Sequence, residues 1–326
     1  MMSLRYHVIS IAAVFLAVAV GVVLGSTALS GALLSGLSGE KDDLARQVSE
    51  LNAERSDLRS QLADADGFAA VVGPLVVRDQ LTQRTVALIS TPDVRQADRD
   101  AMRALVSHAG GQVTADLRLT EAFTDPAQSD RLRDVVVRLL PAGIRLPSAS
   151  DPGTLSGGLI GPLVLINKDT NQPQASQQET DAALAGLAEG GFLRASENLR
   201  PAQVAIVLDG GSAERGRPGG GSSVQALRTT GDRAATVARF AIQVDRAGAG
   251  AVLAGGTGSA DGSGPIGVVR ADGSASGALS TVDNVDRGAG RVATVLALRE
   301  QLDGRAESYG SAVNARAVAP GATPGR

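Results

Sequence analysis

The sequence contains no cysteine and few of the other side chains that bind soft metals or act as nucleophiles. His7 and His108 are its only histidines, and it has three methionines. Without cysteine the chain has no disulfides, no thiolate metal sites and no thiol nucleophile. A serine triad needs a histidine base and usually a G-x-S-x-G turn, which is absent. These absences predict that the protein is not a conventional enzyme.

Aromatic residues and an excess of charge are also missing. Only 2% of the residues are aromatic and none is tryptophan, whereas a transmembrane β-barrel carries girdles of aromatic side chains. The net charge is -3, and the basic residues are scattered along the chain, so no nucleic-acid partner is expected. The only lysines, Lys41 and Lys168, lack the glycine spacing of a phosphate-binding G-x-x-x-x-G-K-[ST] loop.

A long apolar run occupies the N-terminal region, reading VISIAAVFLAVAVGVVLG from Val8 to Gly25. About 20 apolar residues cross a hydrocarbon core as a helix, so residues 8–28 are expected to span a membrane. Positive Arg5 precedes the run and acidic residues from Glu40 onward follow it, which predicts a cytoplasmic segment 1–7 and an exported body. The alternative is a cleaved signal sequence, because small residues follow at Ser26-Thr27-Ala28.

A heptad pattern follows the apolar run. Apolar residues are spaced alternately four and three apart in residues 37–66, at Leu44, Val48, Leu51, Leu58 and Leu62. This spacing is typical of a coiled-coil stalk and predicts a homodimer or a higher oligomer through this segment. An amphipathic helix folded back on its own domain has the same periodicity.

Residues 85–312 are expected to form an extracytoplasmic α/β domain with a parallel, Rossmann-like sheet, after a joint at residues 67–84. Short apolar runs alternate with helical patterns, which indicates β-α-β units. Residues 141–162 and 209–223 are expected to be loops, and residues 313–326 a disordered tail. The expected strands are 86–90, 112–120, 204–208, 251–254, 266–270 and 280–282, and the expected helices are 97–109, 179–188, 232–247 and 289–302.

Few residues qualify as metal ligands, and no bound cofactor is expected. Asp209 follows an expected strand, and Asp283 and Asp286 lie together after another, which is where α/β proteins place ligand groups. The alternative roles are a turn for Asp209, a helix N-cap for Asp286 and a helix C-terminal residue for His108. The spelling G-x-G-x-x-G occurs from Gly262 to Gly267, but a strand-like VVR follows it instead of the helix that pyrophosphate binding requires.

Four features in this order resemble a known family: SLRYHVISIAAVFLAVAVGVVLGS at residues 3–26, the leucine heptad segment at 37–66, VALISTPD at 86–93 and STVDNVDRGAGRVATVLALREQL at 280–302. The chain resembles the mycobacterial copper-transport outer-membrane proteins of the MctB type over nearly its whole length. The resemblance implies a cell-envelope protein, placed in the outer membrane, that contributes to copper efflux and copper tolerance, with copper as the transported ion. The alternative is a non-catalytic structural or adaptor protein of the envelope, which acts through its coiled coil and its α/β domain.

Overall fold

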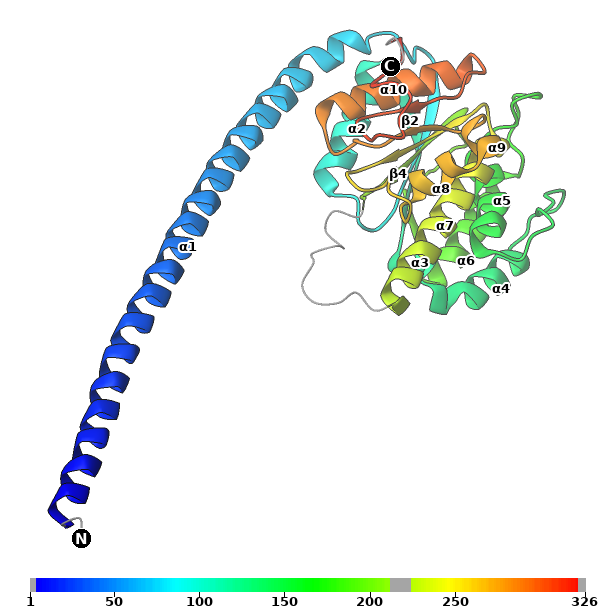
Figure 1. Cartoon of the computed structure of the whole chain (residues 1–326). Helices are drawn as coiled ribbons and strands as arrows, with labels where there is room; N and C mark the ends of the chain where they lie inside the picture. Colours follow the sequence, from blue (N-terminus) through cyan, green and yellow to red (C-terminus); the bar gives the residue numbers. More distant parts are fainter. Residues whose placement is uncertain (1–3, 212–223, 322–326) are drawn as a thin grey trace. The chain divides into compact units, whose positions relative to one another are not determined.

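The structure is a computed structural model that describes residues 4–211 and 224–321 (Figure 1). The chain divides into two units, residues 1–64 and residues 65–326. One helix, α1 (Leu4–Val76), begins in the first unit and ends in the second. Within it, the 19 residues Tyr6–Leu24 have a mean hydropathy of 2.6 and none of them is buried by the rest of the chain. This segment is long and apolar enough to cross a membrane.

The second unit is an α/β domain whose elements follow from its pattern of apolar residues. Its strands are β1 (Thr85–Ser90), β2 (Gln112–Leu119), β3 (Leu193–Ala195), β4 (Val204–Asp209), β5 (Ala251–Gly255), β6 (Ser280–Val282) and β7 (Ser308–Tyr309). Its helices are α2 (Gln96–His108), α3 (Glu121–Thr124), α4 (Ser129–Arg138), α5 (Pro152–Val164), α6 (Gln177–Glu189), α7 (Val224–Ala247), α8 (Pro265–Ala271), α9 (Gly273–Ser276) and α10 (Gly288–Leu302), with a short 3-10 helix η1 (Pro126–Gln128).

In the described part of the chain the strands form one seven-stranded sheet in the order β3-β2-β1-β4-β5-β6-β7. All neighbouring strands are parallel except β2 and β3, which are antiparallel. The first six strands have the order of a doubly wound dinucleotide-binding fold. The prediction of a mixed α/β fold with a mostly parallel sheet is therefore confirmed.

Helices cover both faces of this sheet (Figure 1). Val86 and Leu88 of β1 belong to the core that α2 and α10 cover, whereas Ala87 and Ile89 belong to the core beneath α5 and α7. Neighbouring residues of a strand point to opposite faces, so β1 contributes apolar side chains to both cores. This is why the strand is a continuous apolar run rather than an alternating one.

The expected joint at residues 67–84 is wrong in its first half, because α1 continues through Gly73 and Pro74 to Val76. The residues after Val76 belong to the α/β domain, because Val77 and Leu81 are fully buried in the core that α2 and α10 cover. A Gly-Pro pair is typical of a break in a helix, but here packing against the domain keeps the helix continuous. A Cβ on Gly73 would lie 2.8 Å from Val292 Cγ2 of α10.

The expected loop at residues 141–162 is also wrong in its second half, where α5 begins at Pro152. Glycines recur every fourth residue in α5, and they let this helix approach α7 closely. A Cβ on Gly153 would lie 2.3 Å from the carbonyl oxygen of Thr236, and one on Gly157 would lie 2.7 Å from that of Phe240. The glycine-rich composition that indicates a loop is here the composition of a tight helix–helix contact.

The tail expected to be disordered at residues 313–326 is folded as far as Gly321, and residues 322–326 lie outside the described part. Arg316 donates its backbone N–H to Ser308 O at 2.8 Å, and Gly310 donates to Ala317 O at 3.0 Å. Ala317 and Ala319 pack against the core that α2 and α10 cover. The composition indicates disorder. The backbone hydrogen bonds to Ser308 of β7 and to Gly310, which follows β7, instead hold this segment in one conformation.

Replacing Gly157 by alanine is expected to destabilise the body by about 1–3 kcal/mol, because the new methyl group forces α5 away from α7. The matched control is Gly231→Ala in α7, where a Cβ has no heavy atom within 4 Å. That change is expected to be neutral or to stabilise by up to about 1 kcal/mol through helix propensity. Urea unfolding of both variants, followed by circular dichroism, measures the difference. Equal midpoints for the two variants would contradict the close-contact role of α5.

Candidate functional site

A cleft of the α/β domain lies at the carboxyl ends of the parallel strands and has a volume of about 440 Å³. We call it the switch-point cleft. It is lined by the loops that follow β1, β4, β5 and β6 and by residues of α2, α3 and α7. The residues are Thr91, Pro92, Asp93, Arg95, Asp98, Glu121, Thr124, Asp209, Gly210, Gly211, Thr230, Arg233, Ala234, Val237, Thr257, Ser263, Gly264, Pro265 and Asp286.

The topology of the sheet creates this cleft. From β1 the chain moves outward to β2 and β3, and then it returns to place β4 on the other side of β1. The loops that follow β1 and β4 therefore diverge in opposite directions, and a crevice opens between them at the carboxyl ends of these strands. Ligands of open α/β sheets bind in this kind of crevice.

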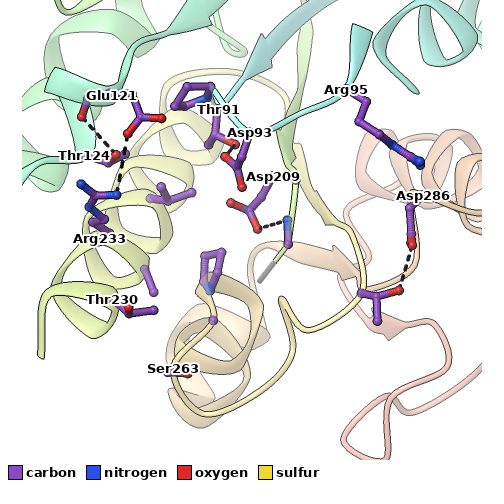
Figure 2. A pocket seen from close by; sticks show the side chains of 18 of the residues that line it. Thr91, Asp93, Arg95, Glu121, Thr124, Asp209, Thr230, Arg233, Ser263 and Asp286 are labelled. Carbon is purple, nitrogen blue, oxygen red and sulfur yellow. Dashed lines mark hydrogen bonds and ion pairs between the residues drawn. The ribbon is translucent and has the colours of Figure 1, made fainter. Parts of the chain in front are cut away.

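Asp93 and Asp209 lie in the middle of the cleft (Figure 2). Asp93 Oδ1 accepts a 2.6 Å hydrogen bond from Thr91 Oγ1. Asp209 is 4% exposed, and its Oδ2 accepts a 3.0 Å hydrogen bond from the backbone N–H of Gly211. Gly210 is required here, because a Cβ at this position would lie 2.3 Å from the carbonyl oxygen of Asp93. The expected turn role of Asp209 is confirmed, and the same turn brings the loops after β1 and β4 into contact.

Charged pairs from other elements flank these two aspartates. Nη1 of Arg233 on α7 lies 3.8 Å from Oε2 of Glu121 on α3. Arg95 donates a hydrogen bond from Nε to Asp98 Oδ2 at 2.7 Å. Asp98 also receives a 3.3 Å hydrogen bond from Arg291 of α10. The rest of the predicted loop at residues 209–223, from residue 212 onward, lies outside the described residues.

Asp286 reaches the cleft from the loop after β6, and its Oδ2 accepts a 2.8 Å hydrogen bond from Thr257 Oγ1 (Figure 2). The expected N-cap role of Asp286 is wrong, since the residue at the N-cap of α10 is Arg287. The N-terminal amide of α10, that of Gly288, instead donates to Asp66 Oδ1 of α1 at 2.8 Å. Asp66 also lies 3.2 Å from Arg287 Nη1, so α1 supplies the cap from a distant part of the sequence.

Asp283 is not part of the cleft. Its Oδ2 lies 2.8 Å from Arg270 Nη1, and both side chains are almost fully buried. Its Oδ1 accepts from the backbone N–H of Ser311 at 2.8 Å and of Ala312 at 3.2 Å. Burial lowers the pKa of the Arg270 guanidinium, and the hydrogen bond and the charge of Asp283 oppose that shift. The carboxylate of Asp283 thus ties α8 to the segment that follows β7.

His108, the remaining candidate ligand, is exposed in the last turn of α2. Because α2 begins beside the cleft and runs back along the sheet, its C-terminus lies at the amino edge of β2 rather than at the carboxyl edge. Of the four candidate residues, the structure brings together Asp209 and Asp286 and leaves Asp283 and His108 elsewhere.

The expected strand at residues 266–270 is wrong, because this segment forms α8. Pro265 at the first helical turn favours a helix start, although the apolar VVR sequence resembles a strand. A helix therefore begins within the G-x-G-x-x-G spelling. However, its glycines allow close packing between the helix start and the preceding loop: a Cβ on Gly264 would lie 2.3 Å from Ser259 O, and one on Gly267 of α8 would lie 1.9 Å from Asp261 O.

The side chains that line the cleft carry more negative than positive charge. Five acidic side chains and two arginines face it, so it attracts cationic or hydroxyl-bearing ligands and repels phosphate groups. Among the described residues there is no group of three or more histidines, aspartates or glutamates that fits a metal ion.

Sequence reasoning identified Asp209 and Asp286 but missed Asp93, Asp98 and Glu121. The signal for two of them was present: Asp93 and Glu121 follow the expected strands at residues 86–90 and 112–120, as Asp209 follows its own strand. Applying the strand-end rule to every expected strand finds them.

The chain matches the model of the family described as "Copper transport outer membrane protein, MctB" over residues 1–320. It is 38% identical to proteins named copper transporter MctB from Mycobacterium tuberculosis and Mycobacterium bovis, over 98% of this chain and 99% of each relative. It is 36% identical to the protein of the same name from Mycobacterium leprae, over 93% of this chain and 94% of that one.

Replacing Asp283 by asparagine is expected to destabilise the body by about 3–5 kcal/mol, because it leaves the buried Arg270 without its counter-charge. The control is Asp303→Asn, which removes the half-exposed pair of Asp303 with Arg299 and is expected to change stability by about 0.5 kcal/mol or less. Urea unfolding measures both, and limited proteolysis reports release of the C-terminal segment. A variant as stable as the control would contradict the role of Asp283 as a structural tie.

Proposed function

Because this chain belongs to the family of copper transport outer membrane proteins of the MctB type, we propose that it contributes to copper efflux and copper tolerance in the cell envelope. The observation that carries the proposal is the extent of the match. It covers residues 1–320, and therefore includes the apolar N-terminal segment as well as the α/β domain. The family is named for copper transport and not for an enzymatic reaction.

The membrane topology forms part of the proposal. The apolar segment Tyr6–Leu24 anchors the protein, and the body lies on the extracytoplasmic side. Arg5 on the N-terminal side and the acidic Glu40, Asp42 and Asp43 on the other side support this orientation, because positively charged flanks stay in the cytoplasm. The family description supports the outer membrane as the final location.

Copper enters the proposal as cargo and not as a resident ion, because the α/β domain that the structure describes offers few donor atoms that suit copper. Copper(I) prefers thiolate or thioether and copper(II) prefers imidazole. Met102 is fully buried in the core, and His108 is exposed at the end of α2. The switch-point cleft, in turn, offers carboxylate and hydroxyl oxygens, which suit harder cations.

Deleting the gene is expected to raise the copper content of cells and their sensitivity to copper salts, and the full-length chain is expected to restore both. A chain that lacks residues 1–36 is expected to restore neither, because without the apolar segment the body is not exported. Zinc sensitivity serves as the control for metal specificity. Elemental analysis of washed cells measures the content. Unchanged copper content and sensitivity in the deletion strain would contradict the proposal.

The stalk supports a further element of the proposal, a parallel homodimer through residues 37–66. The heptad residues Leu44, Val48, Leu51, Leu58 and Leu62 are each 46–63% exposed in the single chain. A second copy in parallel register covers this apolar stripe, with Arg55 forming one charged layer in the seam.

The absence of cysteine makes single-cysteine variants a direct test of the dimer and of the topology. Leu51→Cys, in the seam, is expected to form a disulfide-linked dimer on mild oxidation, because residues at d positions face each other in a parallel coil. Ser49→Cys, on the outer face, is the matched control and is expected to remain largely monomeric on denaturing gels. A membrane-impermeant maleimide is expected to label Ser49→Cys in intact cells. Equal cross-linking of the two variants would contradict the dimer, and labelling only after lysis would contradict the topology.

A further inference from the structure

A second, smaller pocket of the α/β domain lies on the other side of the Thr91–Pro92 turn and has a volume of about 290 Å³. It shares Thr91, Pro92 and Glu121 with the switch-point cleft, but arginines line it. Arg99 of α2, Arg118 of β2 and Arg194 of β3 face it, against Glu121 as the single acidic residue. We call it the arginine pocket. Its charge is opposite in sign to that of the neighbouring cleft.

The pocket is positioned by the fold: Arg99 is buried, whereas Arg118 and Arg194 are exposed on β2 and β3 beside it. Asp116 and Arg118 are two residues apart on β2 and therefore point to the same face of the sheet. Leu117 and Leu119 point to the opposite face, into the core beneath α5 and α7. Arg99, from the helix that covers the Asp116 side, is ion-paired with Asp116. The three arginines thus converge on one face at the carboxyl end of β2.

Arg99 is 4% exposed and its guanidinium is only partly satisfied. Its Nη2 contacts Asp116, but Nε and Nη1 are buried without a hydrogen-bond partner among the described residues. Asp116 does not accept hydrogen bonds from these two nitrogens, because its Oδ1 contacts Arg99 Nη2 and its Oδ2 pairs with Arg103. Buried donors without partners are unfavourable, and an oxyanion supplies charged oxygens that can accept hydrogen bonds from such a guanidinium.

Arg118 and Arg194 provide an independent second observation. They are directly opposite each other in the antiparallel register of β2 and β3, where their Cβ atoms are about 4.5–5.5 Å apart. Like charges placed opposite each other destabilise a sheet. Neither arginine has an ion pair or a side-chain hydrogen bond to any residue that the structure describes. An anion between them removes this repulsion.

We propose that the arginine pocket binds a small tetrahedral oxyanion, either inorganic phosphate or sulfate or the phosphate group of a phosphomonoester. A water molecule satisfies Arg99 Nε but leaves the repulsion between Arg118 and Arg194 in place, whereas an oxyanion addresses both features. Arginine suits this ligand class because its planar fork presents paired donors to phosphate oxygens. This inference depends on the fold of the body and not on a role in copper transport.

The test uses the full-length protein in a non-ionic detergent, titrated with inorganic phosphate at constant ionic strength against chloride. The wild type is expected to bind phosphate saturably by calorimetry, and its thermal unfolding midpoint, followed by circular dichroism, is expected to rise. The double variant Arg118→Gln/Arg194→Gln is expected to bind at least about tenfold more weakly. The charge-matched control is Arg138→Gln/Arg145→Gln, at two exposed positions outside the pocket, which is expected to bind as the wild type does.

Two further measurements separate a binding role from a purely structural one and identify the source of the phosphate. Without phosphate and at low ionic strength, Arg118→Gln alone is expected to raise the unfolding midpoint, because it removes the like-charge pair. A second titration with glycerol 3-phosphate distinguishes a phosphomonoester from a free inorganic anion by which of the two binds more tightly. The proposal is overturned if the wild type shows no saturable oxyanion binding, if the double variant binds like the control, or if Arg118→Gln lowers the midpoint.

Discussion

Burial of both faces of the parallel sheet is the constraint on which the remaining structure of the body depends. Every residue of β4 and of β5 is buried, and consecutive strands of a parallel sheet need crossover connections. The helices that supply these connections cover both faces and leave no room for charged groups along the central strands. The polar chemistry of the domain is therefore concentrated where the strands end, and the reversal between β1 and β4 opens the cleft there.

The same constraint explains which elements the sequence predicts. Strands at residues 86–90, 204–208 and 251–254 are recognisable because burial on both faces produces continuous apolar runs. The segment at 266–270 has the same composition, but a proline in the first turn and burial against the sheet make it helical. In α5 the glycines that indicate a loop instead allow the helix to approach α7 closely. The decisive information lies in the partner element, α7, about 80 residues further along the sequence.

In the candidate site, too, the sequence predicts some residue roles and not others. The strand-end rule places Asp209 and Asp286 at one edge of the sheet, and it applies equally to Asp93. By contrast, nothing near Asp283 in the sequence indicates that its carboxylate binds Arg270 and two amides of the segment after β7. Likewise, the cap of α10 comes from Asp66, which precedes Gly288 by 222 residues. Roles that depend on such distant partners cannot be assigned from local sequence patterns.

The two pockets that flank the Thr91–Pro92 turn bear on how a protein of this family acts on copper. One is rich in carboxylates and the other in arginines, and neither presents the sulfur or imidazole donors that hold copper ions tightly. A transport role does not require tight binding by every component, because an ion that is held too strongly is not released. By charge and by donor type, the two pockets are therefore suited to oxygen-bearing ligands rather than to a soft metal ion.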